Sequence, residues 1–256
     1  MQSPLRFLIP NGFTAASMAL GLASIVCSAT GSFTIAAWMV LWGVLLDKLD
    51  GGAARLLNAS SAFGAEMDSF ADFVSFGIAP SALVYFYLVD VGPFDAHSVL
   101  LMGCCALYTI ALSARLARFN VSEPPGGKNF FFGIPSTLCG AMVASGFLTA
   151  LKYNAPGPVW AAIPLVMAVY GILMVSNIRL PKFQLTWSKP VNIFQIVNMA
   201  IAYIITPLMI FPEYLFFMSS GYMVIGATWA LFHPPESGEP DESGEGMSLE
   251  ESVTAG

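Results

Sequence analysis

The segment DKLDGGAARLLNASSAFGAEMDSFAD, residues 47–72, places a group of charged residues between strongly apolar regions. It contains four aspartates, one glutamate, one lysine and one arginine, although the chain of 256 residues is 56% hydrophobic and only 10% charged. Soluble domains carry about a quarter charged residues. Charge inside a membrane segment is unfavourable unless it faces a cavity or a partner. This segment therefore decides both the fold and the functional hypothesis.

Eight apolar runs flank or overlap this segment, and most approach the roughly 20 residues that a helix needs to cross a bilayer. They cover residues 12–30, 33–49, 69–89, 98–116, 134–151, 159–176, 191–210 and 214–232. The sequence therefore predicts an all-α polytopic membrane protein with about eight transmembrane helices.

The placement of lysine and arginine predicts the orientation of these helices. With the N-terminus in the cytoplasm, nine of the ten basic residues lie on the cytoplasmic side, and Lys152 alone lies outside. This asymmetry follows the positive-inside rule and predicts that both termini are cytoplasmic. We expect a multi-pass protein of the cell membrane whose active site faces the cytosol.

The net charge of −6 comes from the C-terminal tail, which holds seven acidic residues and no basic ones after Pro235. Its composition predicts a disordered cytoplasmic segment over residues 236–256. The chain has no basic character of the kind that binds nucleic acid. The four cysteines fall inside the apolar runs and lack metal-type spacing, so we interpret them as small apolar side chains.

The acidic residues of the opening segment fall on two helix faces. At 100° per residue, Asp47 and Asp50 share one stripe of the second helix with the small residues Gly51 and Ala54. Asp68 and Asp72 lie one turn apart on the third helix.

The residues between these helices predict a tight turn. Asn58, Ser60 and Ser61, followed by Gly64, form a compact polar connection that makes the two helices an antiparallel hairpin. The hairpin brings the four aspartates together near the cytosolic surface.

Converging carboxylates repel one another and take up protons unless a cation lies among them. Oxygen ligands favour a hard cation, namely Mg²⁺, Mn²⁺ or Ca²⁺. Small residues at 51 and 54 allow a large ligand to approach, and Arg55 offers a planar fork of donors to a phosphate. Together these features indicate metal-assisted chemistry on a pyrophosphate. A solvated hairpin turn is the alternative, and four aspartates at this spacing disfavour it.

The same residues resemble the signature of the CDP-alcohol phosphotransferases: Asp47-x-x-Asp50-Gly51-x-x-Ala54-Arg55, eight residues, Gly64, three residues, Asp68, three residues, Asp72. The resemblance implies a core of six transmembrane helices, usually in a homodimer, that transfers a phosphatidyl or similar group from a CDP-linked donor to an alcohol and releases CMP. We accordingly assign residues 1–190 to this core and residues 191–235 to two additional transmembrane helices.

The resemblance also implies roles for individual residues. It assigns divalent metal, Mg²⁺ or Mn²⁺, to Asp47, Asp50 and Asp68, and the general base, with a further possible metal contact, to Asp72. The positions that line the CDP site in the family correspond to Gly51, Ala54, Arg55 and Gly64.

Five further segments resemble the bacterial CDP-diacylglycerol–serine O-phosphatidyltransferases: IPNGFT (9–14), ADFVSFGIAPSALVY (71–85), ARLARFNV (114–121), FFGIPS (131–136) and VSNIRLPKF (175–183). Family members that use phosphorylated acceptors or inositol typically carry a cation after the fourth aspartate, whereas Phe73 stands here. A buried phosphate without its counter-charge binds poorly. The expected substrates are therefore CDP-diacylglycerol and L-serine, and the expected products are phosphatidylserine and CMP.

Arg115 and Arg118 are candidates for the acceptor carboxylate or the donor phosphate. An equal alternative is that they are ordinary cytoplasmic flanking residues. Another acceptor, such as glycerol-3-phosphate, inositol or choline, is the alternative within the family. A divalent-cation transporter is the alternative from another class, but the charges gather at one end of one hairpin and have no continuation through the other helices.

Overall fold

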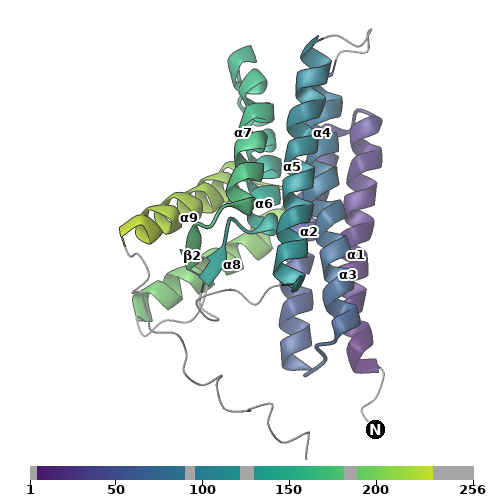
Figure 1. Ribbon diagram of the computed structural model, residues 1–256, viewed down its shortest axis with the longest axis vertical. Coiled ribbons are helices and arrows are strands. Elements are labelled where there is room, and N and C mark those ends of the chain that lie inside the picture. Colours follow the sequence, from purple (N-terminus) through teal and green to yellow (C-terminus); the bar gives the residue numbers. More distant parts are fainter. Residues whose placement is uncertain (1–4, 90–95, 122–129, 182–188, 233–256) are drawn as a thin grey trace, which may run out of the picture.

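The computed structural model describes residues 5–89, 96–121, 130–181 and 189–232, and in these ranges the chain is helical apart from one pair of short strands (Figure 1). The predicted acidic tail, 236–256, lies outside the described residues. The helices are α1 (Leu5–Ala29), α2 (Phe33–Leu56), α3 (Ala62–Asp72), the π-helix η1 (Phe73–Ile78), α4 (Ala79–Leu88), α5 (Ala96–Val121), α6 (Ser136–Lys152), α7 (Gly157–Val175), α8 (Lys189–Leu208) and α9 (Pro212–Phe232).

Every predicted apolar run lies largely within a helix, and α3, η1 and α4 follow one another without a break. Four described segments are long and apolar enough to cross a membrane: Arg6–Ala29, Ala62–Leu88, His97–Val121 and Gly157–Val175. Ser136–Lys152 and Asn192–Leu208 are apolar but shorter. These helices support a membrane protein, whereas the count of eight spans and the orientation of the termini stay predictions.

The prediction of a purely helical chain missed a small antiparallel sheet. Strand β1 (Phe130–Phe132) pairs with β2 (Arg179–Pro181), so that Phe130 lies opposite Pro181 and Phe132 opposite Arg179. The two segments were expected to be connections between helices. Their pairing joins the chain before α6 to the chain after α7.

The helices form a bundle with two oblique additions. Figure 1 shows α1 to α7 along the long axis of the molecule, with α8 and α9 lying obliquely beside them. Helix α9 packs against α6, where the Phe216 ring lies so close to Gly146 that a Cβ there would approach it to 2.9 Å. Helix α8 reaches α2 through Tyr203, whose hydroxyl donates to the Leu45 carbonyl at 3.2 Å.

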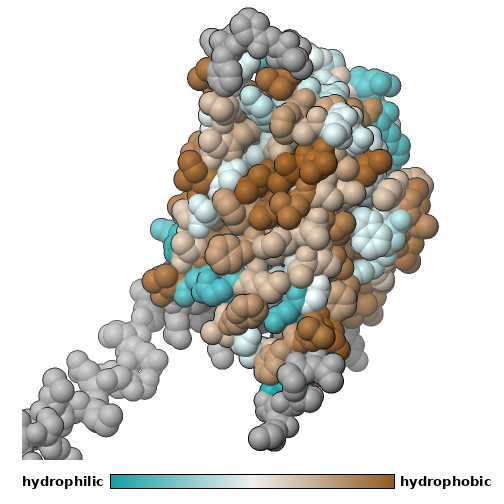
Figure 2. All heavy atoms as spheres, turned by 90° about the vertical axis from the view of Figure 1, so that its right-hand side faces the viewer, coloured by the Kyte–Doolittle hydropathy of each residue, from teal (hydrophilic) through white to brown (hydrophobic). Residues whose placement is uncertain are grey.

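Apolar side chains cover much of the outside of this bundle as well as its core. Figure 2 shows hydrophobic residues across the middle of one face, and large exposed side chains include Val26 of α1, Ile110 of α5 and Ile172 of α7. Inside, Phe76, Tyr108 and other fully buried side chains pack between the helices. An apolar exterior around a packed core suits a protein whose solvent is lipid.

The helix that carries the third and fourth aspartates changes its winding directly after Asp72. Pro80 has no N–H, so it cannot donate to the Phe76 carbonyl four residues earlier. The Tyr108 hydroxyl of α5 donates to that carbonyl instead, at 2.8 Å, and Thr109 donates to the Gly77 carbonyl at 3.3 Å. Buried backbone groups need such partners. Helix α5 thus supports the π-helical turn next to the site.

Helix α1 packs closely against the same π-helix. The Ser75 hydroxyl donates to the Ser17 carbonyl at 2.9 Å. A Cβ added at Gly21 would lie 2.8 Å from the Ser75 Cα, which is a backbone atom. Small residues permit this kind of close helix approach in membranes.

Gly21→Ala is therefore expected to destabilise the protein by about 1–3 kcal/mol, because the added methyl forces α1 away from η1. The melting temperature of the purified protein in detergent micelles measures the loss. Gly12→Ala is the matched control on the same helix, since a Cβ there meets no atom within 4 Å. Equal melting temperatures for the two variants would contradict this account of the packing.

Candidate active site

The turn between α2 and α3 holds the predicted hairpin together. The Ser61 hydroxyl accepts a hydrogen bond from the Gly64 N–H at 3.0 Å and caps the start of α3. Asn58 adopts a positive φ of 47°, a conformation that asparagine tolerates better than most residues. The Ala59 N–H donates to the Ala54 carbonyl at 2.9 Å and closes the end of α2. The hairpin predicted from these polar residues is confirmed.

Three of the four aspartates meet at one point. Carboxylate oxygens of Asp47, Asp50 and Asp68 all lie within 4.8 Å of one another. Within the described part of the chain, none of the three lies at ion-pair distance from a lysine or arginine. A set of oxygen ligands whose charge the protein leaves uncompensated fits a hard divalent cation. These residues can therefore hold a divalent cation.

Asp72 lies beside this cluster and has its own partners. It is one helical turn beyond Asp68 and only 8% exposed. Its Oδ2 accepts a hydrogen bond from the Ser136 hydroxyl at 2.6 Å. The fourth aspartate thus differs from the other three because α6 supplies a donor to it.

Helix α1 also contributes to the cluster through a residue that the sequence did not indicate. The Thr14 hydroxyl lies 2.9 Å from Asp50 Oδ2 and 3.1 Å from the Pro10 carbonyl, and both are possible acceptors of its single proton. The carboxylate is the stronger acceptor. Thr14 ends the segment IPNGFT, whose resemblance to the family was the available signal, but 36 residues separate it from Asp50.

The residues expected to line the CDP site lie near the turn of the hairpin, in the last turns of α2 and the first turn of α3. Arg55 is exposed, and its guanidinium lies over Gly51, where a Cβ would be 3.5 Å from Nη1. Ala54 is half-buried one residue earlier. A Cβ at Gly64 would come within 3.2 Å of the Asn11 side chain of α1. The backbone is thus open at Gly51 and crowded at Gly64, and the CDP-binding roles stay predictions.

The two candidate arginines of α5 have different surroundings. Arg115 is only 8% exposed, and its Nη1 donates to the Ser136 hydroxyl at 3.2 Å. Arg118 donates to the carbonyls of Val175 and Ser176, at 3.0 and 3.3 Å, and so ties α5 to the end of α7. Arg115 thus lies beside the aspartates, whereas Arg118 joins two helices. A substrate contact stays a prediction for both.

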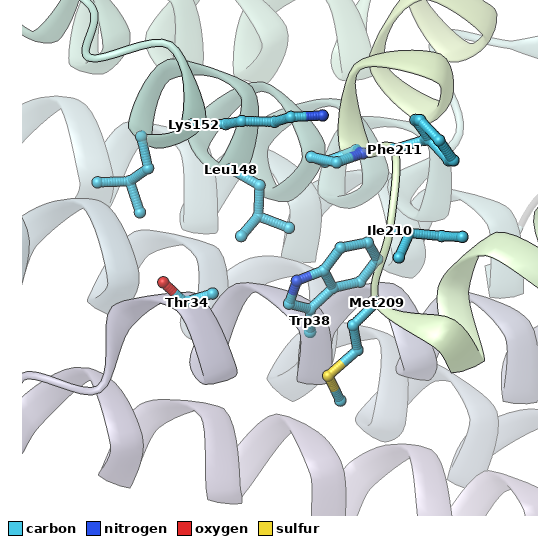
Figure 3. Close-up of a pocket in the computed structure, with 9 residues that line it drawn as sticks. Thr34, Trp38, Leu148, Lys152, Met209, Ile210 and Phe211 are labelled. Atoms are coloured by element: carbon cyan, nitrogen blue, oxygen red, sulfur yellow. The ribbon is translucent and has the colours of Figure 1, made fainter.

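A separate pocket lies at the other end of α2 (Figure 3). Its volume is about 480 Å³, and it is lined by Thr34, Trp38, Leu148, Leu151, Lys152, Met209, Ile210, Phe211 and Pro212. Thr34 precedes Asp47 by 13 residues, which is about 20 Å along a helix with a rise of 1.5 Å per residue. The pocket is therefore distinct from the aspartate cluster.

Comparison with known proteins identifies the family. The model of the CDP-alcohol phosphatidyltransferase family matches residues 7–175, which include all four aspartates and most of the helical bundle. This chain belongs to that family.

Similar proteins narrow the comparison within the CDP-alcohol phosphatidyltransferases. A CDP-diacylglycerol–serine O-phosphatidyltransferase of Helicobacter pylori is 36% identical over 201 residues, which cover 77% of this chain and 82% of the relative. The enzyme of the same name from Bacillus subtilis is 34% identical over 176 residues, covering 69% and 91%. An archaetidylserine synthase of Methanothermobacter thermautotrophicus is 32% identical over 176 residues, covering 68% and 70%.

The contact between Thr14 and Asp50 generates a prediction for this family member. Thr14→Val keeps the shape of the side chain but removes the hydroxyl, so Asp50 loses a donor that orients it. Loss of such a partner is expected to lower the affinity for Mn²⁺ by about 10-fold or more. Calorimetric titration of Mn²⁺ into the protein in detergent measures it. Thr14→Ser retains the hydroxyl and should bind normally, whereas unchanged affinity in Thr14→Val would contradict the role.

Proposed function

We propose that the protein transfers the phosphatidyl group of CDP-diacylglycerol to the hydroxyl of L-serine, forming phosphatidylserine and CMP. The observation that carries this proposal is the geometry of the four aspartates in a member of this family. Oxygens of three carboxylates lie within 4.8 Å of one another, which suits a divalent cation, and a fourth carboxylate has a separate hydrogen-bond partner. The serine transferases among the similar proteins support the choice of acceptor.

The reaction is a direct displacement at phosphorus. Mg²⁺ or Mn²⁺ held by Asp47, Asp50 and Asp68 would neutralise the pyrophosphate and stabilise the CMP that leaves. Asp72 takes the proton of the serine hydroxyl while that oxygen bonds to the phosphorus on the lipid side. The bond between this phosphorus and the CMP oxygen breaks in the same step, so the mechanism requires no covalent enzyme intermediate.

The surrounding residues orient the two substrates. Arg55, exposed over Gly51, is placed to meet the diphosphate of the donor, and Ala54 and Gly64 complete the proposed CDP site. The Nε of Arg115 is buried and has no hydrogen-bond partner in the described part of the chain. A buried donor of this kind costs free energy unless a ligand satisfies it. We assign Arg115 to the carboxylate of the acceptor or the phosphate of the donor, and Arg118 to support of the same region.

The absence of a basic residue at the sequence position directly after Asp72 favours serine over phosphorylated acceptors. Phe73 occupies that position, and its ring packs against the buried core. The placement of basic residues in the sequence supports a site that faces the cytosol from the cell membrane. Homodimerisation follows from the family resemblance and is part of the same proposal.

The proposed reaction is tested by measuring CMP release from CDP-diacylglycerol in mixed micelles with Mn²⁺ or Mg²⁺. L-serine, glycerol-3-phosphate, inositol and choline are supplied in parallel, and the lipid product of each is identified. We expect equal amounts of CMP and phosphatidylserine with serine, and no release in EDTA. If CMP were released only with another acceptor, the transfer from CDP-diacylglycerol would still hold, but the assignment of serine as the acceptor would be wrong. Failure of every acceptor with folded, metal-loaded protein would overturn the proposed transfer.

The base assignment has its own test. Asp72→Asn removes the proton acceptor but keeps the size of the side chain, so kcat is expected to fall by about 10²- to 10⁴-fold. Binding of CDP-diacylglycerol should persist because the three-carboxylate cluster is intact. Glu66→Gln is the control, since Glu66 lies on the same helix, is exposed and stands outside the cluster. A rate for Asp72→Asn close to that of Glu66→Gln would rule out the assignment.

A further inference from the structure

Ser136 connects the two charged groups that the proposed reaction places around the acceptor. Its hydroxyl lies 2.6 Å from Asp72 Oδ2 and 3.2 Å from Arg115 Nη1. The guanidinium can only donate, so the serine oxygen accepts from Arg115 and gives its single proton to Asp72. The direction of both bonds is thereby fixed. All three side chains are buried, and they come from α3, α5 and α6.

The local backbone fixes the start of α6, where Ser136 lies. Gly133 adopts a positive φ of 71° and lies so close to α7 that a Cβ would approach the Met174 carbonyl to 2.0 Å. Its N–H donates to the Ile178 carbonyl at 2.8 Å, next to the strand pair. Pro135 then leads into α6, whose first residue is Ser136. The strand pair and the glycine turn thus hold the start of α6 against Asp72.

We propose that Ser136 is a positioning residue for the acceptor. It orients the Asp72 carboxylate for proton removal, and it holds Arg115 at a fixed separation from that carboxylate. Because Asp72 Oδ2 and Arg115 Nη1 both contact the same hydroxyl, the distance between these two atoms cannot exceed the combined length of the two hydrogen bonds. An acceptor that carries a hydroxyl and an anionic group a few bonds apart, as serine does, fits this spacing.

The inference rests on the proposed function and deepens it, because it concerns the acceptor side of the same site. Ser136 contacts Asp72, which is not one of the three carboxylates of the cluster. Loss of its hydroxyl is therefore expected to affect turnover of the acceptor and to leave donor and metal binding intact. A role restricted to helix packing would instead lower thermal stability and all binding constants together.

The experiment compares Ser136→Ala with Ser136→Thr in the full-length protein. We expect kcat/KM for serine to fall by about 10- to 100-fold in Ser136→Ala. KM for CDP-diacylglycerol and the calorimetric affinity for Mn²⁺ should stay at the wild-type values. Ser136→Thr keeps the hydroxyl and should recover activity to within a few-fold. Ser145→Ala is the matched control, because Ser145 is buried on the same helix and donates to the Ala141 carbonyl of its own helix.

A second comparison tests whether Ser136 acts through Asp72. In the Asp72→Asn background, Ser136→Ala should cause little further loss, because residues that act as a unit are not additive. Ser136→Cys, a weak donor of similar size, should repeat the loss if the alanine variant proves unstable. Wild-type kcat/KM in a folded hydroxyl-free variant would overturn the proposal, as would a loss that threonine fails to recover. Absence of serine-dependent CMP release by the wild-type protein would instead overturn the proposed function.

Discussion

The repulsion among three carboxylates, whose oxygens lie within 4.8 Å of one another, is the constraint on which the rest of the site depends. Side chains of like charge at this separation move apart or take up protons unless a cation and a rigid frame hold them. The frame here is the α2–α3 hairpin, closed at its turn by the Ser61 cap and packed along α1. Thr14 adds a donor from that same helix. The hairpin and Thr14 thus hold the carboxylates in this arrangement.

Helices α5 and α6 supply polar groups to the region around Asp72. Helix α5 contributes Arg115. About two turns earlier, it contributes the Tyr108 hydroxyl, which donates to the Phe76 carbonyl of the π-helix. Helix α6 contributes Ser136. Irregular backbone inside a membrane protein persists only where such partners exist. The π-helix directly after Asp72 is therefore supported from α5, which also carries Arg115 next to Ser136.

The helices and the aspartate cluster could be predicted because both depend on local pattern. Apolar runs mark the helices, and the spacing of Asp47, Asp50, Asp68 and Asp72 lies within one hairpin. Thr14 and Ser136 could not be found this way, because 36 and 64 residues separate them from the carboxylates that they contact. The π-helix could not be predicted because it depends on the distant Tyr108. The two strands could not be predicted because three residues are too few to show an alternating pattern.

The difference between Asp72 and the other aspartates follows from what each group must do. A carboxylate whose oxygens bind a cation has little electron density left to take a proton, so a metal ligand is a poor base. Asp72 lies next to the cluster, and one of its oxygens accepts a hydrogen bond from a hydroxyl of another helix, as suits the base of the proposed reaction. Chelation by all four carboxylates would stabilise the ion and leave no base. Ser136 thus gives Asp72 a partner from α6, whereas the donor to Asp50 comes from α1.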